Sequence, residues 1–80
     1  MNINLKHTER GFLRADFKDR NEQSCSIQES SLATEYAIWL GCNEGTHHMG
    51  ECMARMHLTQ KQVQALLPLL EKFVESGGLA

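Results

Sequence analysis

The stretch LRADFKDRNEQSCSIQ, residues 13–28, decides the fold of this chain. Apolar side chains alternate with charged ones in its first half and with polar ones in its second half, so each half predicts a β-strand with one face in solvent. Pairing Phe17 with Cys25 and Ala15 with Ile27 puts both apolar sets on one face. This register leaves a three-residue loop, Arg20 to Glu22, in which one of the last two residues takes a left-handed conformation.

Further strands are expected on both sides of this hairpin. Upstream, Ile3 and Leu5 alternate with polar residues and predict a first strand, and TERG at 8–11 predicts the turn that follows it. Downstream, AIWLG at 37–41 is apolar at every side chain, which predicts a short strand buried on both faces and therefore central in the sheet. RMHL at 55–58 alternates again, with Met56 and Leu58 on one side.

A helix is predicted over residues 59–76. Thr59 is its N-cap, Gln62 closes a capping box, and Gly77 with Gly78 ends it. Pro68 falls on the side opposite the apolar stripe, where the backbone carbonyl that it frees can reach water. The stripe that should pack on the sheet consists of Val63, Leu66, Leu67, Leu70, Phe73 and Val74.

Together these segments predict an α+β fold, in which an antiparallel sheet of about four to five strands carries one C-terminal amphipathic helix across one face. The 80 residues form a single small domain, β-rich over 1–58 and helical over 59–76. A domain of this size buries only about 60–65% of its unfolded surface, so its stability is marginal without a metal, disulfides or a partner.

The bulk properties exclude several classes. A net charge of −2 gives no attraction to nucleic acid or an anionic membrane. The chain has no apolar run of about 18 residues, so no membrane span is expected. MNINLKHTER at 1–10 has no apolar core of a signal peptide. Without a secretion signal, the three cysteines are expected to be reduced thiols in a cytoplasm.

The segment CNEGTHHMGECMARMH, residues 42–57, holds side chains of the kind that bind zinc. Its spacing, C-x4-H-H-x3-C-x4-H, lacks the tight knuckle of common zinc modules. Two readings stay open, a zinc-stabilised module and a flexible polar loop, and the second is favoured. We therefore expect no metal and no cofactor, and if a metal binds, its ligands come from Cys42, His47, His48, Cys52 and His57.

No catalytic constellation is evident. A Cys–His pair in this segment could form a nucleophile, but no oxyanion element or orienting acid accompanies it. Phosphate-binding glycine loops and the HExxH and GxSxG motifs are missing from the sequence. The sequence therefore favours a protein that is not an enzyme.

Two segments are candidates for a binding surface. Arg14 and Lys18 lie on the solvent-exposed face of the predicted hairpin, and Arg20 lies at its tip. These residues form either a docking patch or an ordinary solvated sheet face. The stretch after the hairpin joins hydroxyl and carboxylate side chains to the only Tyr and Trp, and such aromatics are common contact residues unless they lie in the core. Its candidate residues are Ser30, Ser31, Thr34, Glu35, Tyr36 and Trp39.

The blocks DFKDRN…CSIQESSLATEYAIWLG and ARMHLTQKQVQALLPLLEKFVESGGL resemble small proteins encoded by tailed bacteriophages and prophages. The resemblance covers roughly residues 11–79, and it departs at the hairpin tip, where those proteins carry a glycine and this chain has Asn21-Glu22. It implies a phage or prophage origin and a bacterial cytoplasm, and it transfers no activity to particular residues.

The resemblance in turn implies a small protein that binds a host bacterial protein, for example an inhibitor of a defence system similar to anti-CRISPR proteins. Two alternatives remain. One is a self-assembling accessory protein, such as a homodimer formed through sheet edges. The other is a protein that sequesters a small ligand with the segment 30–39.

Overall fold

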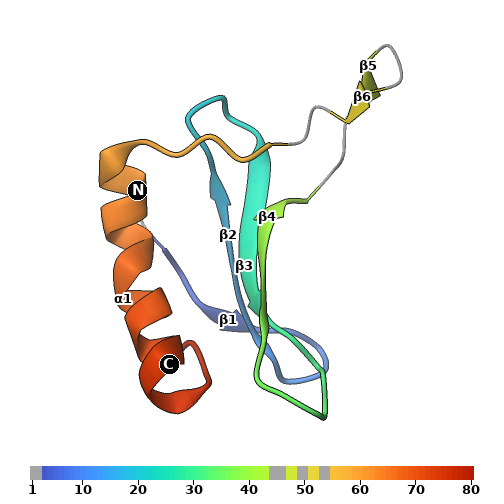
Figure 1. Cartoon of the computed structure of the whole chain (residues 1–80), viewed down its shortest axis with the longest axis vertical. Helices are drawn as coiled ribbons and strands as arrows, with labels where there is room; N and C mark the ends of the chain where they lie inside the picture. The colour runs from blue at the N-terminus through green and yellow to red at the C-terminus, as the bar shows by residue number, and fades with distance from the viewer. Residues whose placement is uncertain (1–2, 44–46, 49–50, 53–54) are drawn as a thin grey trace.

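The computed structural model describes residues 3–43, 47–48, 51–52 and 55–80. Four antiparallel strands form one sheet in the order β1-β2-β3-β4, a separate pair β5-β6 follows, and a single helix α1 ends the chain. Figure 1 shows α1 lying along one face of the four-stranded sheet. The predicted α+β fold is therefore confirmed. The bounds are β1 Lys6–His7, β2 Leu13–Lys18, β3 Ser24–Glu29, β4 Ile38–Cys42, β5 His47–His48, β6 Glu51–Cys52 and α1 Gln60–Ser76.

The β2–β3 hairpin has the register that the sequence predicts. Phe17 pairs with Cys25, and Ala15 pairs with Ile27. These four side chains are buried beneath α1 and form the centre of the core. Glu22 takes the left-handed conformation with φ of 61°, which a non-glycine residue adopts at some cost in strain.

The prediction that 37–41 is a central strand is wrong. Among the described residues, β4 lies at the end of the sheet and pairs with β3 alone. Ile38, Leu40 and Cys42 face α1, on the same side of the sheet as Cys25 and Ile27. Trp39 faces the other side, so the strand is apolar in sequence although only one of its faces packs on the core. Trp39 is 67% exposed, so an apolar sequence does not correspond here to burial on both faces.

The outer segments keep their alternation but pair less than expected. Ile3 and Leu5 pack against the core, yet the paired part of the first strand is only β1. Met56 and Leu58 also pack against the core from an extended segment that belongs to no strand. Both segments therefore cover the core with apolar side chains, although most of their backbone does not pair with a neighbouring strand.

The ends of α1 are those predicted. The Thr59 side chain accepts a hydrogen bond from the backbone N–H of Gln62, and the Gln62 side chain accepts one from the N–H of Thr59. Gly77, with φ of 79°, ends the helix in the left-handed conformation that glycine favours. Pro68 is exposed, as predicted. Among the described residues, no helix is both long and apolar enough to cross a membrane.

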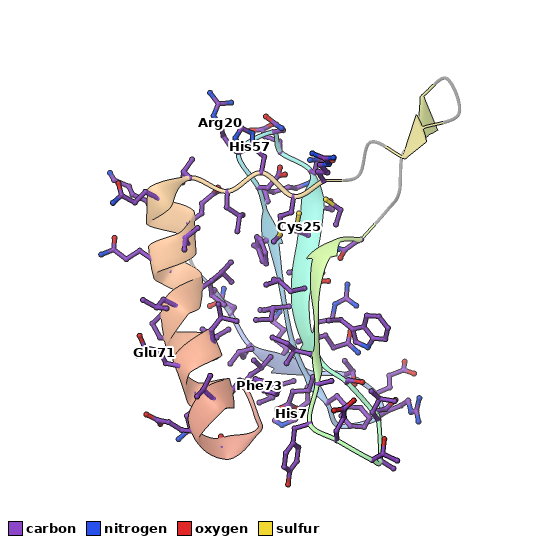
Figure 2. The ribbon with its side chains drawn as sticks, in the orientation of Figure 1. His7, Arg20, Cys25, His57, Glu71 and Phe73 are labelled. Carbon is purple, nitrogen blue, oxygen red and sulfur yellow. The ribbon has the colours of Figure 1, made fainter. Side chains whose placement is uncertain are left out.

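The apolar stripe of α1 is rotated from its predicted position. Leu66 is buried, and Leu69, Leu70 and Phe73 pack against the core beside it. Figure 2 shows Phe73 pointing toward the sheet and Glu71 pointing away from it. Three members of the predicted stripe are exposed instead, because a single helix on a sheet buries only one arc of its surface: Val63, Leu67 and Val74.

The C-terminal tail completes the core. Leu79 is buried, and its N–H donates to Glu29 Oε2 at 3.0 Å. The other oxygen of Glu29 accepts from the N–H of Leu13 at 2.8 Å. One carboxylate on β3 therefore holds both the start of β2 and the end of the chain.

We expect Leu66→Ala to destabilise the domain by about 2–5 kcal/mol, because it removes a fully buried side chain and leaves a cavity. That is a large share of the ~5–15 kcal/mol typical of a folded domain. Urea denaturation checks the change. The matched control is Leu67→Ala, since the neighbouring leucine is 45% exposed and its loss should cost clearly less. Equal losses for the two variants would contradict the orientation of α1.

Candidate functional site

The face of the sheet that points away from α1 is the best candidate for a binding surface. Strand alternation places Arg14, Asp16 and Lys18 of β2 on this face, opposite the side on which Ala15 and Phe17 are buried. The pairing of Arg14 with Gln28, and of Gln28 with Trp39, brings residues of β2, β3 and β4 into one row. We call this surface the open face.

Hydrogen bonds order the polar groups of the open face. Arg14 Nη2 lies 2.9 Å from Asp16 Oδ1, and Arg14 Nη1 donates to Gln28 Oε1 at 2.9 Å. Asn43 Nδ2 donates to Asp16 Oδ1 at 3.2 Å, and Ser26 Oγ donates to Asn43 Oδ1 at 2.6 Å. The Arg14 guanidinium is thus held between Asp16 of β2 and Gln28 of β3.

These hydrogen bonds also affect the ionisation of the open face. The Arg14 hydrogen bond is the main cause that lowers the pKa of Asp16, and it outweighs the partial desolvation that acts in the opposite direction. The charge of Lys6 on β1, which pairs with Arg14, lowers this pKa further. Lys18 donates to Ser24 Oγ at 3.0 Å. The open face therefore carries three cations and one carboxylate in a chain whose net charge is −2.

Trp39 is the exposed aromatic of the open face. It lines a shallow hollow together with Arg14, Gln28 and Ser31. The sequence left open whether Trp39 is a core or a contact residue, and an exposed fraction of 67% places it outside the core. An apolar ring beside an ordered guanidinium is typical of anchor residues in protein interfaces.

The other candidates from the segment 30–39 lie elsewhere. The N–H of Ser30 donates to the carbonyl of Ala37 at 3.0 Å and closes a loop between β3 and β4. Tyr36 is 79% exposed, its ring lies against Gly77 at the end of α1, and it lines a different hollow from Trp39. Ser31, Thr34 and Glu35 are exposed on this loop, and Ser31 alone of them lines the hollow beside Trp39.

Arg20 belongs to the hairpin tip rather than to the row of Arg14 and Trp39. Its N–H donates to the carbonyl of His57 at 2.8 Å, and Figure 2 shows both residues at the same end of the molecule. The candidates are therefore divided among three places: Arg14, Lys18 and Trp39 on the open face, Arg20 at the tip, and Tyr36 by the helix end.

Asp19 is a buried acid at the tip that the sequence did not single out, although Asp is common at the start of turns. Its Oδ1 accepts from the N–H groups of Asn21 and Gln23 at 2.9 and 2.8 Å. Its Oδ2 accepts from Gln23 Nε2 at 2.8 Å and from the N–H of His57 at 2.9 Å. This carboxylate holds the turn and attaches it to the segment that enters α1.

Two cysteine thiols lie close to this acid. Cys25 and Cys42 are directly paired on β3 and β4, and their sulfurs are 3.7 Å apart. Asp19 and the two thiols place one potential metal-ligand atom each within 4.8 Å of one another. Burial is the main cause that raises the pKa of Cys25 to about 11, and the neighbouring Cys42 adds to it. The sequence alone predicts Cys25 only as a member of the apolar face of the hairpin.

The remaining metal-ligand candidates divide into two groups. Cys42 is half-buried, and His57 is exposed, with its Nδ1 3.5 Å from Asn21 Nδ2. The side chains of His47, His48 and Cys52 lie outside the part of the chain that the structure describes. Their backbone forms the β5–β6 pair, in which His47 faces Cys52 and His48 faces Glu51.

Comparison of the chain with protein-family models, with curated proteins and with solved structures gives no match. Its function must therefore be argued from the residues described above.

Asp19 also gives the domain a pH dependence. Desolvation raises its pKa, but hydrogen bonds from His57, Gln23 and Asn21 outweigh this and hold the pKa below the ordinary value of 3.8. A carboxylate whose pKa is lower in the folded state stabilises that state fully above 3.8, and this stabilisation is lost as the pH falls through the folded pKa.

We therefore expect Asp19→Asn to lower the melting temperature at pH 7 by on the order of 10 °C. The gap between the variant and the wild type should shrink as the pH falls below 3.8. Thermal melts from pH 7 down to pH 2 measure this. Asp16→Asn is the control, since that carboxylate is exposed and its loss should change the melting temperature little. A gap that stays constant over the whole pH range would contradict the role of Asp19.

Proposed function

We propose that the chain is a non-enzymatic binding protein that docks on a host bacterial protein through β4 and the open face beside it. The observation that carries this proposal is that β4 pairs on one side only among the described residues, and that its five residues are all uncharged. Edge strands of monomeric proteins are normally shortened, charged or covered, because their free N–H and C=O groups pair readily with another strand.

The two edges of the sheet differ in this respect. β1 has only two residues and carries Lys6, so it has two of the usual protections. β4 has neither, and it exposes Trp39 on one face and Leu40, at 40%, on the other. An added strand would pair with β4 and cover both side chains, which is the arrangement found when a partner extends a sheet.

The charge of the open face favours a partner with an acidic surface. Lys6, Arg14 and Lys18 exceed the single carboxylate of Asp16, although the chain as a whole is acidic. Charges at the rim of an interface mainly steer association and set its salt dependence, whereas a desolvated aromatic supplies affinity. Trp39 would be the anchor, and Arg14, Lys18 and Arg20 would guide approach.

The resemblance to proteins of phages and prophages supports a host protein as the target, and a component of a bacterial defence system is the class we favour. The hollows beside His7, Trp39 and Tyr36 are open to solvent, which gives no support to sequestration of a small ligand. Self-assembly through β4 uses the same edge and is the alternative that the experiment must separate.

The experiment is affinity capture from bacterial lysate with wild type, Trp39→Ala and Val74→Ala. We expect one stoichiometric host protein with the wild type. Trp39→Ala should lose it, since truncating an anchor costs at least about 2 kcal/mol, or roughly 30-fold in Kd. Val74→Ala is the matched control, because this side chain is 85% exposed but lies on α1, and capture should persist.

A charge reversal of Arg14, Lys18 and Arg20 should slow association and weaken its salt dependence. Equal capture by Trp39→Ala and wild type would contradict the proposal. Recovery of the chain alone, with a dimer mass that Trp39→Ala reduces to a monomer, would establish self-assembly in its place. Capture of nucleic acid rather than protein would also overturn it.

A further inference from the structure

We propose that Cys25 and Cys42 form a redox-sensitive pair, which a small disulfide such as glutathione disulfide oxidises to a cross-strand disulfide bond between β3 and β4. This inference goes beyond the docking function proposed above and does not depend on it. A reducing compartment keeps the pair as free thiols, and an oxidising one closes it.

The backbone pairing places the two cysteines where a disulfide fits. Cys25 and Cys42 are direct partners on β3 and β4. The next pair along, Ser24 with Asn43, is hydrogen-bonded, since the N–H of Asn43 donates to the carbonyl of Ser24 at 2.8 Å. Hydrogen-bonded and non-hydrogen-bonded pairs alternate along an antiparallel ladder, so the cysteines form a non-hydrogen-bonded pair with Cα atoms about 4.5 Å apart. This separation lies within the range of about 4.4–6.8 Å that disulfides span.

The two side chains already face each other. Their sulfurs are 3.7 Å apart, and both lie on the face of the sheet that α1 covers. Because the strands set the separation of the two backbones, a sulfur–sulfur bond of about 2.05 Å requires rotation of the side chains and no change of register. Both thiols are free in the reduced protein.

The two thiols differ in their access to an oxidant. Cys42 is half-buried, whereas Cys25 is fully buried. Burial, followed by the neighbouring Cys42 and the charge of Asp19, raises the pKa of Cys25 to about 11, so this thiol is neutral at pH 7. Since a thiolate is the form that attacks a disulfide, and since the oxidant arrives from solvent, Cys42 reacts first.

The reaction proceeds by two thiol–disulfide exchanges. The Cys42 thiol loses its proton, and its sulfur attacks one sulfur of glutathione disulfide, which releases one glutathione and leaves a mixed disulfide on Cys42. The Cys25 sulfur then attacks the Cys42 sulfur, its proton passes to the departing sulfur, and the second glutathione leaves. The protein loses two electrons and two protons, and the oxidant gains both as two molecules of reduced glutathione.

The disulfide would fix the end of β4. Cys42 is the last residue of this strand, which pairs with β3 alone among the described residues. A covalent bond at this point holds the strand end and its register. It also closes a loop between residues 17 positions apart, and such a cross-link stabilises a domain mainly by restricting its unfolded chain.

The test starts from fully reduced protein, which is incubated with glutathione disulfide at pH 7 and quenched with acid. We expect the intact mass to fall by that of two hydrogen atoms, and peptide mapping to show Cys25 joined to Cys42. The melting temperature should rise by on the order of 10 °C, and dithiothreitol should reverse the change.

Three variants identify the thiols and their order of reaction. Cys42→Ser should form no disulfide at Cys25 and show no rise in melting temperature. Cys52→Ser is the matched control, because it removes the third cysteine and should give the same product as the wild type. Cys25→Ala should stop at the first exchange and gain the mass of one glutathione on Cys42, and circular dichroism verifies that this variant is folded.

Several results would overturn the proposal. One is a wild-type protein that keeps both thiols free, or that stops with glutathione on Cys42, after prolonged incubation with excess oxidant. A disulfide that involves Cys52 and disappears in Cys52→Ser would assign the reaction to a different pair. A disulfide between two chains would do the same. If Cys25→Ala is unfolded, Cys42→Ser and Cys52→Ser still decide the result, since neither alters the buried cysteine.

Discussion

The carboxylate of Asp19 is the constraint on which the rest of this fold depends. It is buried at the hairpin tip and accepts four hydrogen bonds, three from its own turn and one from the N–H of His57. The bond from Arg20 to the carbonyl of His57 adds a second connection beside it. The segment that follows His57 places Leu58 against the core and leads directly to the Thr59 cap of α1. A turn acid therefore fixes where the helix starts over the sheet.

Local features of this structure were predictable from the sequence, and arrangements that depend on distant residues were less so. The register of the β2–β3 hairpin follows from apolar alternation and a short turn, because a two-residue loop would put the apolar sets on opposite faces and a three-residue loop puts them on one face. The Thr59–Gln62 capping box and the Gly77 stop are likewise encoded within a few residues. By contrast, β4 was expected to be central, since a short apolar run does not show how many neighbours a strand has. The buried arc of α1 depends on the sheet beneath it, so sequence spacing alone could not choose between Leu67 and Leu69.

The candidate site shows the same division. Arg14 and Lys18 were recognised from the wet face of one strand, and they do share a face. Trp39 joins them only through the pairing of β3 with β4, across a loop that places Tyr36 against Gly77 at the end of α1. Cys25 was read as a core residue, because no local pattern relates it to Cys42, its partner 17 residues later. Sites built from cross-strand partners are hidden from sequence reasoning unless the register of every strand is known.

The docking surface and the cysteine pair meet on β4. Cys42 is the last residue of this strand, and Trp39 lies three residues before it. An edge strand that is paired on one side only is held by half the hydrogen bonds of a central strand, and its end frays unless something fixes it. Asn43 fixes the end that follows Cys42, because its N–H donates to the carbonyl of Ser24 at 2.8 Å and its side chain bonds to Ser26 and Asp16. A rigid edge loses less conformational entropy when a partner strand pairs with it, and this reduces the free-energy cost of docking. The same reasoning explains why so small a domain can leave an apolar edge strand exposed: the bonds of Asn43 hold the strand in the free protein, and a partner would cover it in the complex.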